Sequence, residues 1–415
     1  MEDGPIHREV SGDEIGLYMS SDSRILIPSL LAQSVLSSHR SHTPTHLHTY
    51  THTDTHRTAF MADFELIPHL PFDIAIDCLL RVPLYHHPAL ALVCRSWRAL
   101  VSSSSFLQAR LDSAYADHYA GLIQAVQCCQ SASSTKIPIY AVSLYNPQSS
   151  WSRLPSIPDF PSGLPLFCQC AAVSGKLVIM GGWDPASWGV LRSVHVYDMV
   201  SAQWRRGSPM PSSRSFFTCV AIPGGRRCIA VAGGHDDAKN ALRRVDVYDV
   251  DYDQWREMPD LNEERDECKA VVMDGKLTIV SGYPTESQGQ FGSSGEVYDE
   301  DKSTWKIVDK MWPSGVSPSS AVTIAGELYA CFDGKVMRRR LKDGQWQAVI
   351  ELPQQIKILA CTTSLTQSLF VAGYTAAGST SIHAFTCSVL APSWKVVEPA
   401  SDFSGIFQGA CTMVL

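Results

Sequence analysis

A run of histidines near the start of the chain has the spacing of a metal site. It contains pairs four residues apart, which on a helix would point the same way and could bind zinc or nickel: His42, His46, His48, His52 and His56. Threonines alternate with these histidines, however, and threonine disfavours a helix. No cysteine or carboxylate cluster completes a ligand set. We therefore expect no metal or other cofactor, and we expect residues 1–60 to be a disordered or non-native leader, the working chain beginning at Met61.

Catalytic arrangements are scarce in the rest of the sequence. His195 and His383 lie in strand-like runs, where a packed histidine is the common outcome, and no base is placed beside a nucleophilic serine or cysteine. His235, Asp236 and Asp237 in GGHDD could together bind a metal, although adjacent loop residues of these types more often form a solvated turn. The sequence contains no glycine-rich phosphate loop. It therefore predicts a protein that is not an enzyme.

Composition disfavours several other functions. The chain has 415 residues and a formal charge of -7, which argues against a surface for nucleic acid or for an anionic membrane. No uninterrupted apolar stretch of about 18 residues could span a bilayer. Thirteen cysteines, an odd number without a C-x-x-C pair, indicate reduced thiols packed as small apolar residues. These features predict a protein of the cytoplasm, the nucleus or both.

Repeated tryptophans indicate which elements carry a functional site. After Tyr119, short strand-like runs alternate with glycine, proline, asparagine and aspartate. Tryptophan then recurs at roughly the spacing of kelch-type propeller blades: Trp151, Trp204, Trp255, Trp305, Trp346 and Trp394. Three of these follow a Tyr-Asp pair, and each pair follows a strand that ends in glycine. A small sheet cannot bury its faces alone, so we expect the repeats to stack as blades, with glycines where backbones crowd and aromatic rings between blades.

The number of repeats predicts how the ring closes. Five repeats are nearly whole, at 166–206, 216–257, 268–307, 318–349 and 358–397. Three strands before the first repeat and one after the last would complete a sixth blade and leave no exposed edge. The predicted fold is therefore mainly β: a six-bladed kelch β-propeller over 119–415, with one blade split between N-terminal and C-terminal strands.

The loops of such a propeller would bring charged and aromatic side chains to one face. In a four-stranded blade, the loop that enters the first strand and the loop between the second and third strands lie on the same face. We therefore expect a target-binding rim built from Trp183, Arg214, His235, Asp236, Arg265, Asp266, Glu267, Gln290 and Phe291. Arginine and aromatic anchors dominate protein recognition surfaces. The other interpretation is that the charged run at 264–267 only ties blades together through buried arginine–carboxylate pairs.

The segment before the propeller has a helical period. Asp73 can cap a first helix with an apolar face of Ile74, Cys78 and Val82, beside Ala75 and Leu79. Pro88 suits the first turn of a second helix, whose apolar stripe is Leu90, Val93, Trp97, Leu100 and Val101. A serine run at 102–105 would end it, and a third short helix would start at Phe106. The sequence thus predicts a small all-α domain over 64–110 and a helical linker over 111–118.

This helical segment resembles the F-box. The runs LPFDIAIDCLLRVP and ALVCRSWRALVSSSSFL match its pattern at Leu70, Pro71, Asp73, Leu79, Leu80, Val93, Cys94, Trp97 and Phe106. An F-box followed by a kelch propeller is a combination typical of plants. Further runs look like the subgroup called KISS ME DEADLY, namely GLPLF (163–167), RSFF (214–217), GGHDDAKNAL (233–242), ERDECKAV (264–271) and GQF (289–291).

The resemblance implies a non-catalytic substrate receptor of a cullin-based ubiquitin ligase. The F-box would bind a Skp-type adaptor, and the propeller rim would hold phenylalanine ammonia-lyase or a type-B cytokinin response regulator. The residues expected to dock the adaptor, or to form the helical core behind the docking surface, are Leu70, Pro71, Ile74, Leu79, Val93 and Trp97. Two alternatives are a metal-dependent kelch enzyme or sensor for small molecules, and a scaffold that transfers no ubiquitin.

Overall fold

The computed structural model describes residues 66–126, 138–223, 227–376 and 382–415; the histidine run and the predicted leader lie outside these ranges. The first described segment is helical, with α1 (Phe72–Leu80), the 3-10 turn η2 (Leu84–His86), α2 (His87–Val93), α3 (Arg95–Val101) and α4 (Ser104–Leu111). Among the described helices none is both long and apolar enough to cross a membrane.

Two short helices replace the single second helix that the apolar stripe predicts. Cys94 is extended, with φ -158° and ψ 170°, and its Sγ accepts the Trp97 backbone N–H at 3.4 Å. This side chain caps α3 and separates it from α2. Ser103 caps α4 in the same way by accepting the Phe106 N–H at 3.2 Å. Helix α4 is the short helix that was predicted near Phe106, and it begins two residues earlier, at Ser104.

The first helix buries a different face from the predicted one. Ala75 and Leu79 are buried, whereas Ile74 and Cys78 are exposed. Pro71, not Asp73, occupies the position before the helix, and no side chain caps it. Both faces of α1 are apolar, so the hydrophobic period alone could not identify the buried one.

The predicted helical linker is wrong. Helix α4 ends at Leu111, turns follow, and His118 already begins a strand. The side chain of Arg110 explains the early end, because Nη1 donates to the carbonyls of Leu80 and Val82 at 2.6 and 2.7 Å, and Nη2 donates to Asp117 at 2.7 Å. Residues 112–117 form turns beside this buried pair instead of a continuous helix.

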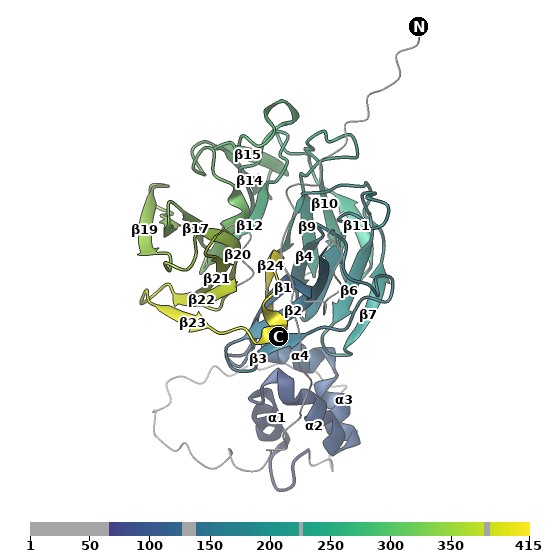
Figure 1. The fold of residues 1–415 in the computed structure, drawn as a ribbon. Helices are drawn as coiled ribbons and strands as arrows, with labels where there is room; N and C mark the ends of the chain where they lie inside the picture. The colour runs from purple at the N-terminus through teal and green to yellow at the C-terminus, as the bar shows by residue number, and fades with distance from the viewer. Residues whose placement is uncertain (1–65, 127–137, 224–226, 377–381) are drawn as a thin grey trace, which may run out of the picture.

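Six four-stranded antiparallel sheets follow (Figure 1). Blade 1 contains β24 (Phe407–Val414), β1 (His118–Val126), β2 (Ile139–Asn146) and β3 (Ser150–Arg153). Blade 2 contains β4 (Gln169–Val173), β5 (Lys176–Met180), β6 (Val194–Asp198) and β7 (Gln203–Gly207). Blade 3 contains β8 (Thr218–Ile222), β9 (Cys228–Ala232), β10 (Val245–Asp249) and β11 (Gln254–Glu257).

The remaining blades repeat this order. Blade 4 contains β12 (Lys269–Met273), β13 (Lys276–Val280), β14 (Gly295–Asp299) and β15 (Thr304–Val308). Blade 5 contains β16 (Val322–Ile324), β17 (Glu327–Phe332), β18 (Lys335–Arg339) and β19 (Trp346–Glu351). Blade 6 contains β20 (Ile358–Leu365), β21 (Ser368–Tyr374), β22 (Ile382–Ser388) and β23 (Trp394–Val397).

The split blade is confirmed. The C-terminal strand β24 is the innermost strand of blade 1 and pairs with β1, with Gly121 opposite Cys411. The innermost strands of neighbouring blades contact one another all the way round, from β24 through β4, β8, β12, β16 and β20 back to β24. The ring is therefore closed by hydrogen bonds between the two ends of the propeller sequence.

The repeated aromatic residues join the blades as predicted. Within blade 3, Tyr248 lies opposite Trp255 and their ring centroids are 4.9 Å apart. The Trp255 Nε1–H donates to the Ser208 carbonyl of blade 2 at 2.8 Å. Trp204, Trp305 and Trp394 make the same 2.8 Å bond to the preceding blade. A single residue per repeat thus both packs its own blade and binds its neighbour.

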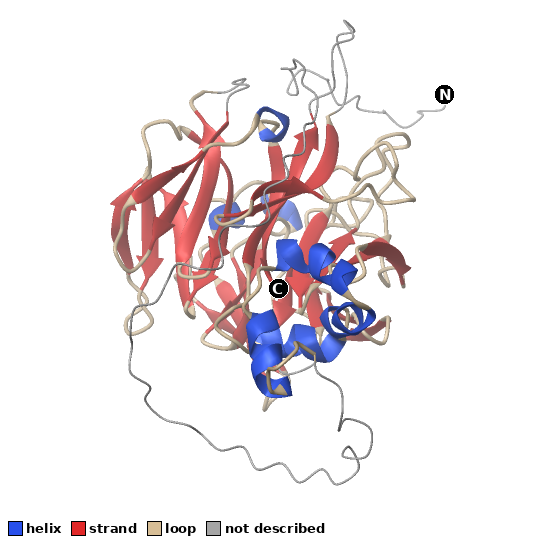
Figure 2. Cartoon of the chain, turned by 90° about the horizontal axis from the view of Figure 1, so that it is seen from below, coloured by secondary structure: helices blue, strands red, loops and turns tan. Residues whose placement is uncertain are grey.

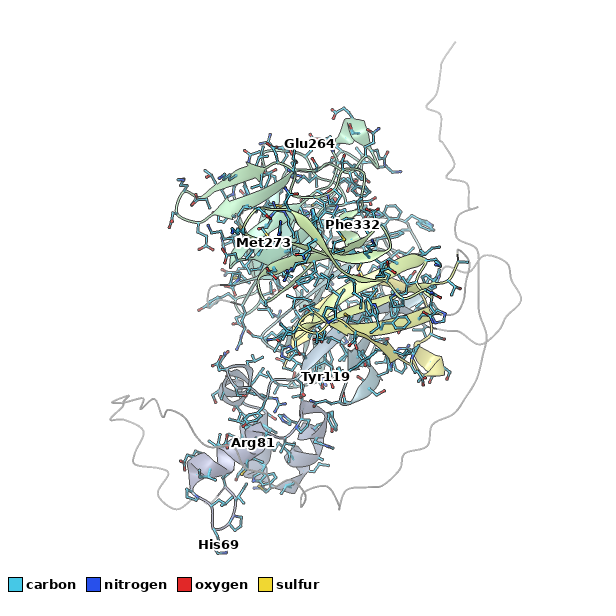
Figure 3. All side chains as sticks on the ribbon, turned by 90° about the vertical axis from the view of Figure 1, so that its left-hand side faces the viewer. His69, Arg81, Tyr119, Glu264, Met273 and Phe332 are labelled. Atoms are coloured by element: carbon cyan, nitrogen blue, oxygen red, sulfur yellow. The ribbon has the colours of Figure 1, made fainter. Side chains whose placement is uncertain are left out.

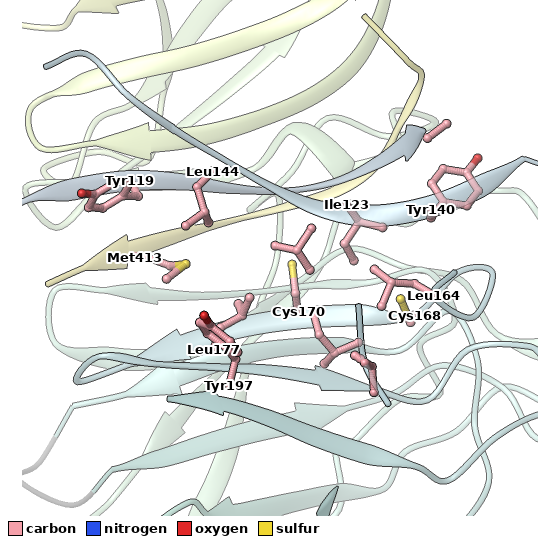
Figure 4. Packing of buried hydrophobic residues seen from close by; sticks show 14 of the residues in the cluster. Tyr119, Ile123, Tyr140, Leu144, Leu164, Cys168, Cys170, Leu177, Tyr197 and Met413 are labelled. Carbon is pink, nitrogen blue, oxygen red and sulfur yellow. The ribbon is translucent and has the colours of Figure 1, made fainter. Parts of the chain in front are cut away.

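Apolar side chains fill the space between blades. Figure 4 shows one such cluster between blades 1 and 2, where Ile123, Cys170 and Leu177 are buried together. The glycines allow the close approach at one end of the blades: Gly234 has φ 82°, and a Cβ there would lie 2.4 Å from the Ser215 carbonyl oxygen. A larger residue at this position would separate the two loops that build the face described next.

Candidate functional site

The two predicted kinds of loop do lie on one face. Isolated antiparallel bridges join Leu166 to Trp183 in blade 2, Ser215 to His235 in blade 3, and Asp266 to Tyr283 in blade 4. Each bridge connects the loop that enters a first strand with the loop that follows a second strand. We call this face the kelch rim, or the rim for short. It is formed by residues 160–168, 182–193, 208–217, 233–244, 258–268 and 281–294.

Two arginines of the predicted rim point into the blades. Arg265 is buried; its Nε lies 3.0 Å from Glu296 Oε1 in β14, and its Nη2 lies 2.7 Å from Glu263. Arg214 is also buried, 2.5 Å from Asp246 in β10. Each arginine anchors an entering loop to the third strand of its own blade. These guanidinium groups position the rim and do not form its surface.

His235 connects two blades beneath the rim. Its Nδ1 lies 2.7 Å from Asp266 Oδ2 in the next blade, and its Nε2 lies 2.7 Å from Ser215 Oγ. The three groups have the order of a hydrolytic triad. Yet Ser215 is 0% exposed, and His235 and Asp266 are 6% and 4% exposed, so a substrate cannot reach the hydroxyl. The arrangement is a buried hydrogen-bond network that joins blades 3 and 4.

The other predicted rim residues reach solvent. Asp236 and Gln290 stand in loops after second strands, Trp183 and Phe291 are half-buried, and Glu267 accepts the Tyr283 hydroxyl at 2.8 Å. Burial and this carboxylate raise the pKa of Tyr283. The phenol therefore stays protonated and acts as the hydrogen-bond donor. Of the nine predicted residues, these five are placed where a bound protein could touch them.

An aromatic row runs along blades 2 and 3, and sequence reasoning missed two of its members, Phe167 and Phe216. Phe167 and Phe216 have ring centroids 4.9 Å apart, Trp183 lies 5.3 Å from Phe167, and the half-exposed Trp188 lies 6.3 Å from Trp183. Phe216 also stacks on His235 at 5.3 Å. Phe167, Phe216 and Glu267 hold equivalent places before three first strands, each with a positive φ of 58°, 53° or 48°. That shared place in the repeat is the signal that could have found the two phenylalanines.

Acidic groups surround this row. Asp184, Asp236, Asp237, Glu264 and Glu267 lie in the rim loops, and none forms an ion pair with Lys or Arg within the described chain. Three nearby arginines are engaged: Arg214 and Arg265 are buried, and Arg244 pairs with Asp246 and Glu257 at 3.0 and 2.6 Å. The exposed cations of the same loops are Arg192, Lys239 and Arg243, which form no salt bridge within the described chain. The rim of blades 2 to 4 therefore presents aromatic rings in loops that carry more acidic than basic residues.

A second candidate surface lies on the helices. Apolar side chains are exposed at the start of α1 and at the end of α2: Leu70 at 36%, Phe72 at 40%, Ile74 at 46%, Val93 at 61% and Leu92 at 78%. We call these five residues the helical patch. Pro71 is exposed beside them. Large apolar side chains left exposed on two helices of a small domain indicate a partner that covers them.

The remaining predicted docking residues belong to the helical core. Leu79 is 2% exposed, and Trp97 packs against the same cluster while its Nε1–H donates to the Leu66 carbonyl at 2.7 Å. The sequence could not separate docking residues from core residues, and the structure separates them: Leu70, Pro71, Ile74 and Val93 face outwards, Leu79 and Trp97 inwards. Phe72 and Leu92 are additional outward residues.

Comparison with known proteins agrees with both parts of the fold. The F-box domain profile matches residues 67–109, and Kelch motif profiles match 166–211, 213–262 and 264–311. F-box/kelch-repeat protein At1g80440 of Arabidopsis thaliana is 40% identical over 301 residues, covering 70% of this chain and 83% of that protein. The chain belongs to the F-box/kelch-repeat proteins. F-box/kelch-repeat protein At1g15670, also of Arabidopsis thaliana, is 34% identical over 84% of this chain and 99% of its own length.

Membership of this family supports a substrate-receptor role in an SCF-type ligase. The F-box implies binding to a Skp-type adaptor, and the kelch propeller implies binding to a target protein.

The possible metal site at His235, Asp236 and Asp237 has another structural role. In the described ranges, no group of three or more His, Cys, Asp or Glu residues has the arrangement of a metal site. The Asp236 side chain instead accepts the backbone N–H groups of Ala238 and Asn240 at 2.9 Å.

The F-box and the propeller form one continuous structure. Asp117 accepts Arg110 Nη2 and the Leu84 N–H, each at 2.7 Å, and its backbone exchanges two hydrogen bonds with Leu415 at the end of the chain. Leu107 of α4 packs on Gly175 in the turn between β4 and β5. Seen from below, the helices lie against this face of the propeller near the C-terminus (Figure 2). The kelch rim lies on the opposite face, as the positions of Glu264 and His69 show (Figure 3).

Proposed function

We propose that the chain is the target-binding subunit of an SCF-type ubiquitin ligase. The helical patch of the F-box binds the Skp-type adaptor, and the kelch rim binds the target protein. The chain itself performs no covalent chemistry. Ubiquitin transfer is accelerated because tethering raises the effective concentration of target lysines near the charged ubiquitin carrier.

The observation that carries this proposal is the placement of two protein-interaction surfaces at opposite ends of one body. His69, next to Leu70 of the helical patch, lies at one end of the molecule, and Glu264 of the rim lies at the other end (Figure 3). The buried Arg110–Asp117 pair and the Leu107 contact with Gly175 join the two parts. A bound target would therefore be held at a defined distance and direction from the adaptor, as a bridging receptor requires.

The targets that we propose follow from the resemblance to the KISS ME DEADLY subgroup: phenylalanine ammonia-lyase or type-B cytokinin response regulators. The cytoplasm and the nucleus are the compartments where such targets would be met. An aromatic and acidic rim suits a target segment that carries lysine or arginine beside apolar residues, because such charges complement the free carboxylates.

Affinity capture of the full chain during proteasome inhibition tests the proposal. Partners bound by both the wild-type chain and a Val93→Asp variant, but longer-lived in cells that carry the variant, would be the targets. Purified phenylalanine ammonia-lyase and a type-B response regulator would then be offered to a reconstituted ligase. Equal lifetimes for every rim-bound partner with both chains would contradict the proposal and favour a scaffold without ubiquitin transfer.

A further inference from the structure

The centre of the propeller contains a cavity that shares Phe216 and Glu267 with the rim and otherwise lies inside the ring. It has a volume of about 440 Å³ and is walled by the innermost strands of all six blades. Its lining consists mainly of small, hydroxyl and thiol side chains, with Phe216 among its aromatic residues. Volumes of roughly 300–1,000 Å³ are typical of sites for small ligands. The cavity is therefore large enough for a compact organic molecule.

Only two charged residues line this cavity within the described chain, Glu267 and Lys269. Glu267 belongs to the rim, where its carboxylate accepts the Tyr283 hydroxyl at 2.8 Å. Lys269 is the first residue of β12 and is half-buried. The described chain gives its ammonium group no hydrogen bond and no carboxylate partner. An ammonium group removed from bulk water without an anion is unfavourable, so this position favours a ligand that brings a negative charge.

The charge of Lys269 acts across the cavity. Burial raises the pKa of the Cys219 and Cys361 thiols, and the positive charge of Lys269 opposes that rise at both. Cys219 belongs to β8 and Cys361 belongs to β20. The innermost strands follow one another in the order β8, β12, β16 and β20, so the two cysteines lie on opposite sides of β12. Lys269, Cys219 and Cys361 all line the cavity, so the lysine and both thiols border one shared space.

The rest of the lining indicates what the anion is attached to. Val220, Ala221 and Val272 are partly exposed and give part of the wall an apolar character, and Phe216 belongs to both the lining and the rim. Gln408 Oε1 is buried without a hydrogen-bond partner in the described ranges, although its Nε2 donates to Cys168 Sγ at 3.8 Å. A flat apolar body would pack between these walls, while a carboxylate would pair with the ammonium group.

We propose that the central channel binds a carboxylate carried on a compact apolar body, with Lys269 as its ion-pair partner. Two sources share this chemistry: a free organic acid, and the C-terminal residue of a polypeptide with an apolar last side chain. Phe216 and Glu267 belong both to the rim and to the lining of the channel, so either source would lie beside a bound target. A ligand there would extend the target-binding surface with a second, independent specificity.

Calorimetric titration of the full chain with benzoate and with benzamide tests the charge requirement without any variant. We expect benzoate to bind at least about tenfold more tightly, since a charge-assisted pair is lost with the amide. Lys269→Met should abolish the difference and Lys269→Arg should retain it. Lys276→Met, which removes an exposed lysine of the same blade, should behave like the wild-type chain. Equal binding of the two probes, or no binding of benzoate, would overturn the proposal.

A second titration identifies the source of the carboxylate. The peptide acetyl-Gly-Gly-Gly-Phe is compared with its C-terminal amide, on the wild-type chain and on Lys269→Met. Tighter binding of benzoate than of the peptide supports a free organic acid. If the peptide acid binds more tightly than benzoate, and its C-terminal amide does not, the result supports the C-terminal residue of a polypeptide as the ligand. If benzoate and the peptide acid bind no better than their amides, the channel is not a carboxylate site.

Discussion

Arg265 Nε lies 3.0 Å from Glu296 Oε1, and both side chains are closed to solvent, at 2% and 0% exposure. The same guanidinium group also donates to the Ser281 carbonyl at 2.8 Å and to Ser294 Oγ at 3.0 Å. This single residue therefore holds the entering loop of blade 4 against the loop after β13. Glu264 and Glu267, on either side of Arg265, depend on it for their position on the kelch rim.

Replacing Arg265 by alanine should therefore destabilise the propeller. Glu296 would be left as an unpaired buried charge, and breaking such a pair costs about 3–5 kcal/mol. The free energy of unfolding, measured by urea denaturation, reports the loss. Arg256→Ala provides the control, because Arg256 is exposed and has no salt bridge within the described chain. Similar values for the two variants would show that the buried pair contributes little.

The helical core and the helical patch should respond differently to truncation. Leu79→Ala removes a fully buried side chain and should lower the stability of the F-box by about 2–5 kcal/mol. Ile74→Ala removes a side chain that is 46% exposed and should change stability by less than about 0.5 kcal/mol. Thermal unfolding of the full chain distinguishes them. A large loss for Ile74→Ala would mean that this residue is part of the core after all.

Acidification should loosen the junction between the F-box and the propeller. Burial lowers the pKa of His87 and of His118 from the usual value of 6.5, so both are held neutral in the folded chain beside Arg110 and Asp117. The unfolded chain binds more protons, and stability therefore falls as the pH drops below about 6.5. Hydrogen exchange of α2, α4 and β1 should accelerate between pH 7.5 and 5.5.

The matching variant for this prediction is His87→Gln, since glutamine can still donate to the Val82 carbonyl that His87 Nε2 contacts at 3.1 Å. It should weaken the pH dependence of exchange in α2 while leaving exchange in the distant blade 4 unchanged. An unchanged pH profile in α2 would show that His87 is not responsible.

The aromatic row should contribute to target binding without contributing to stability. Trp188→Ala removes a ring that is 50% exposed and should weaken target binding by more than about 1 kcal/mol, as exposed anchors of interfaces do. Tyr252→Ala removes a ring that is 72% exposed in the turn after β10, on the face opposite the rim, and should have no effect. Titration of a captured target against both variants checks this. Equal losses would place the target elsewhere.

The architecture was predictable because it repeats. The tryptophan spacing, the Tyr-Asp pairs and the glycine-ended strands recur, so the six blades and the role of β24 in closing the ring follow from the sequence and are confirmed. The burial of Arg265 in an arginine–carboxylate pair was only the alternative interpretation of the sequence, and the burial of Arg214 was not foreseen. Their partners, Asp246 and Glu296, lie about 30 residues later in the third strands, at places that a charge pattern does not connect.

The helical segment shows the other limit. Its apolar residues surround α1 on several sides, because one side forms the core and another is the helical patch. A hydrophobic period identifies such a helix but not which side a partner covers. The interruption at Cys94 depends on one thiol accepting the Trp97 N–H, a local bond that the continuous apolar stripe conceals.

The affinity of the purified full chain for a Skp-type adaptor tests the central claim most directly. The wild-type chain should bind, Val93→Asp should bind at least about a hundredfold more weakly because a charge would be buried in the interface, and Ala109→Asp on the exposed side of α4 should match the wild type. Failure of the wild-type chain to bind, or equal affinity of Val93→Asp, would contradict the assignment of the helical patch as the adaptor site.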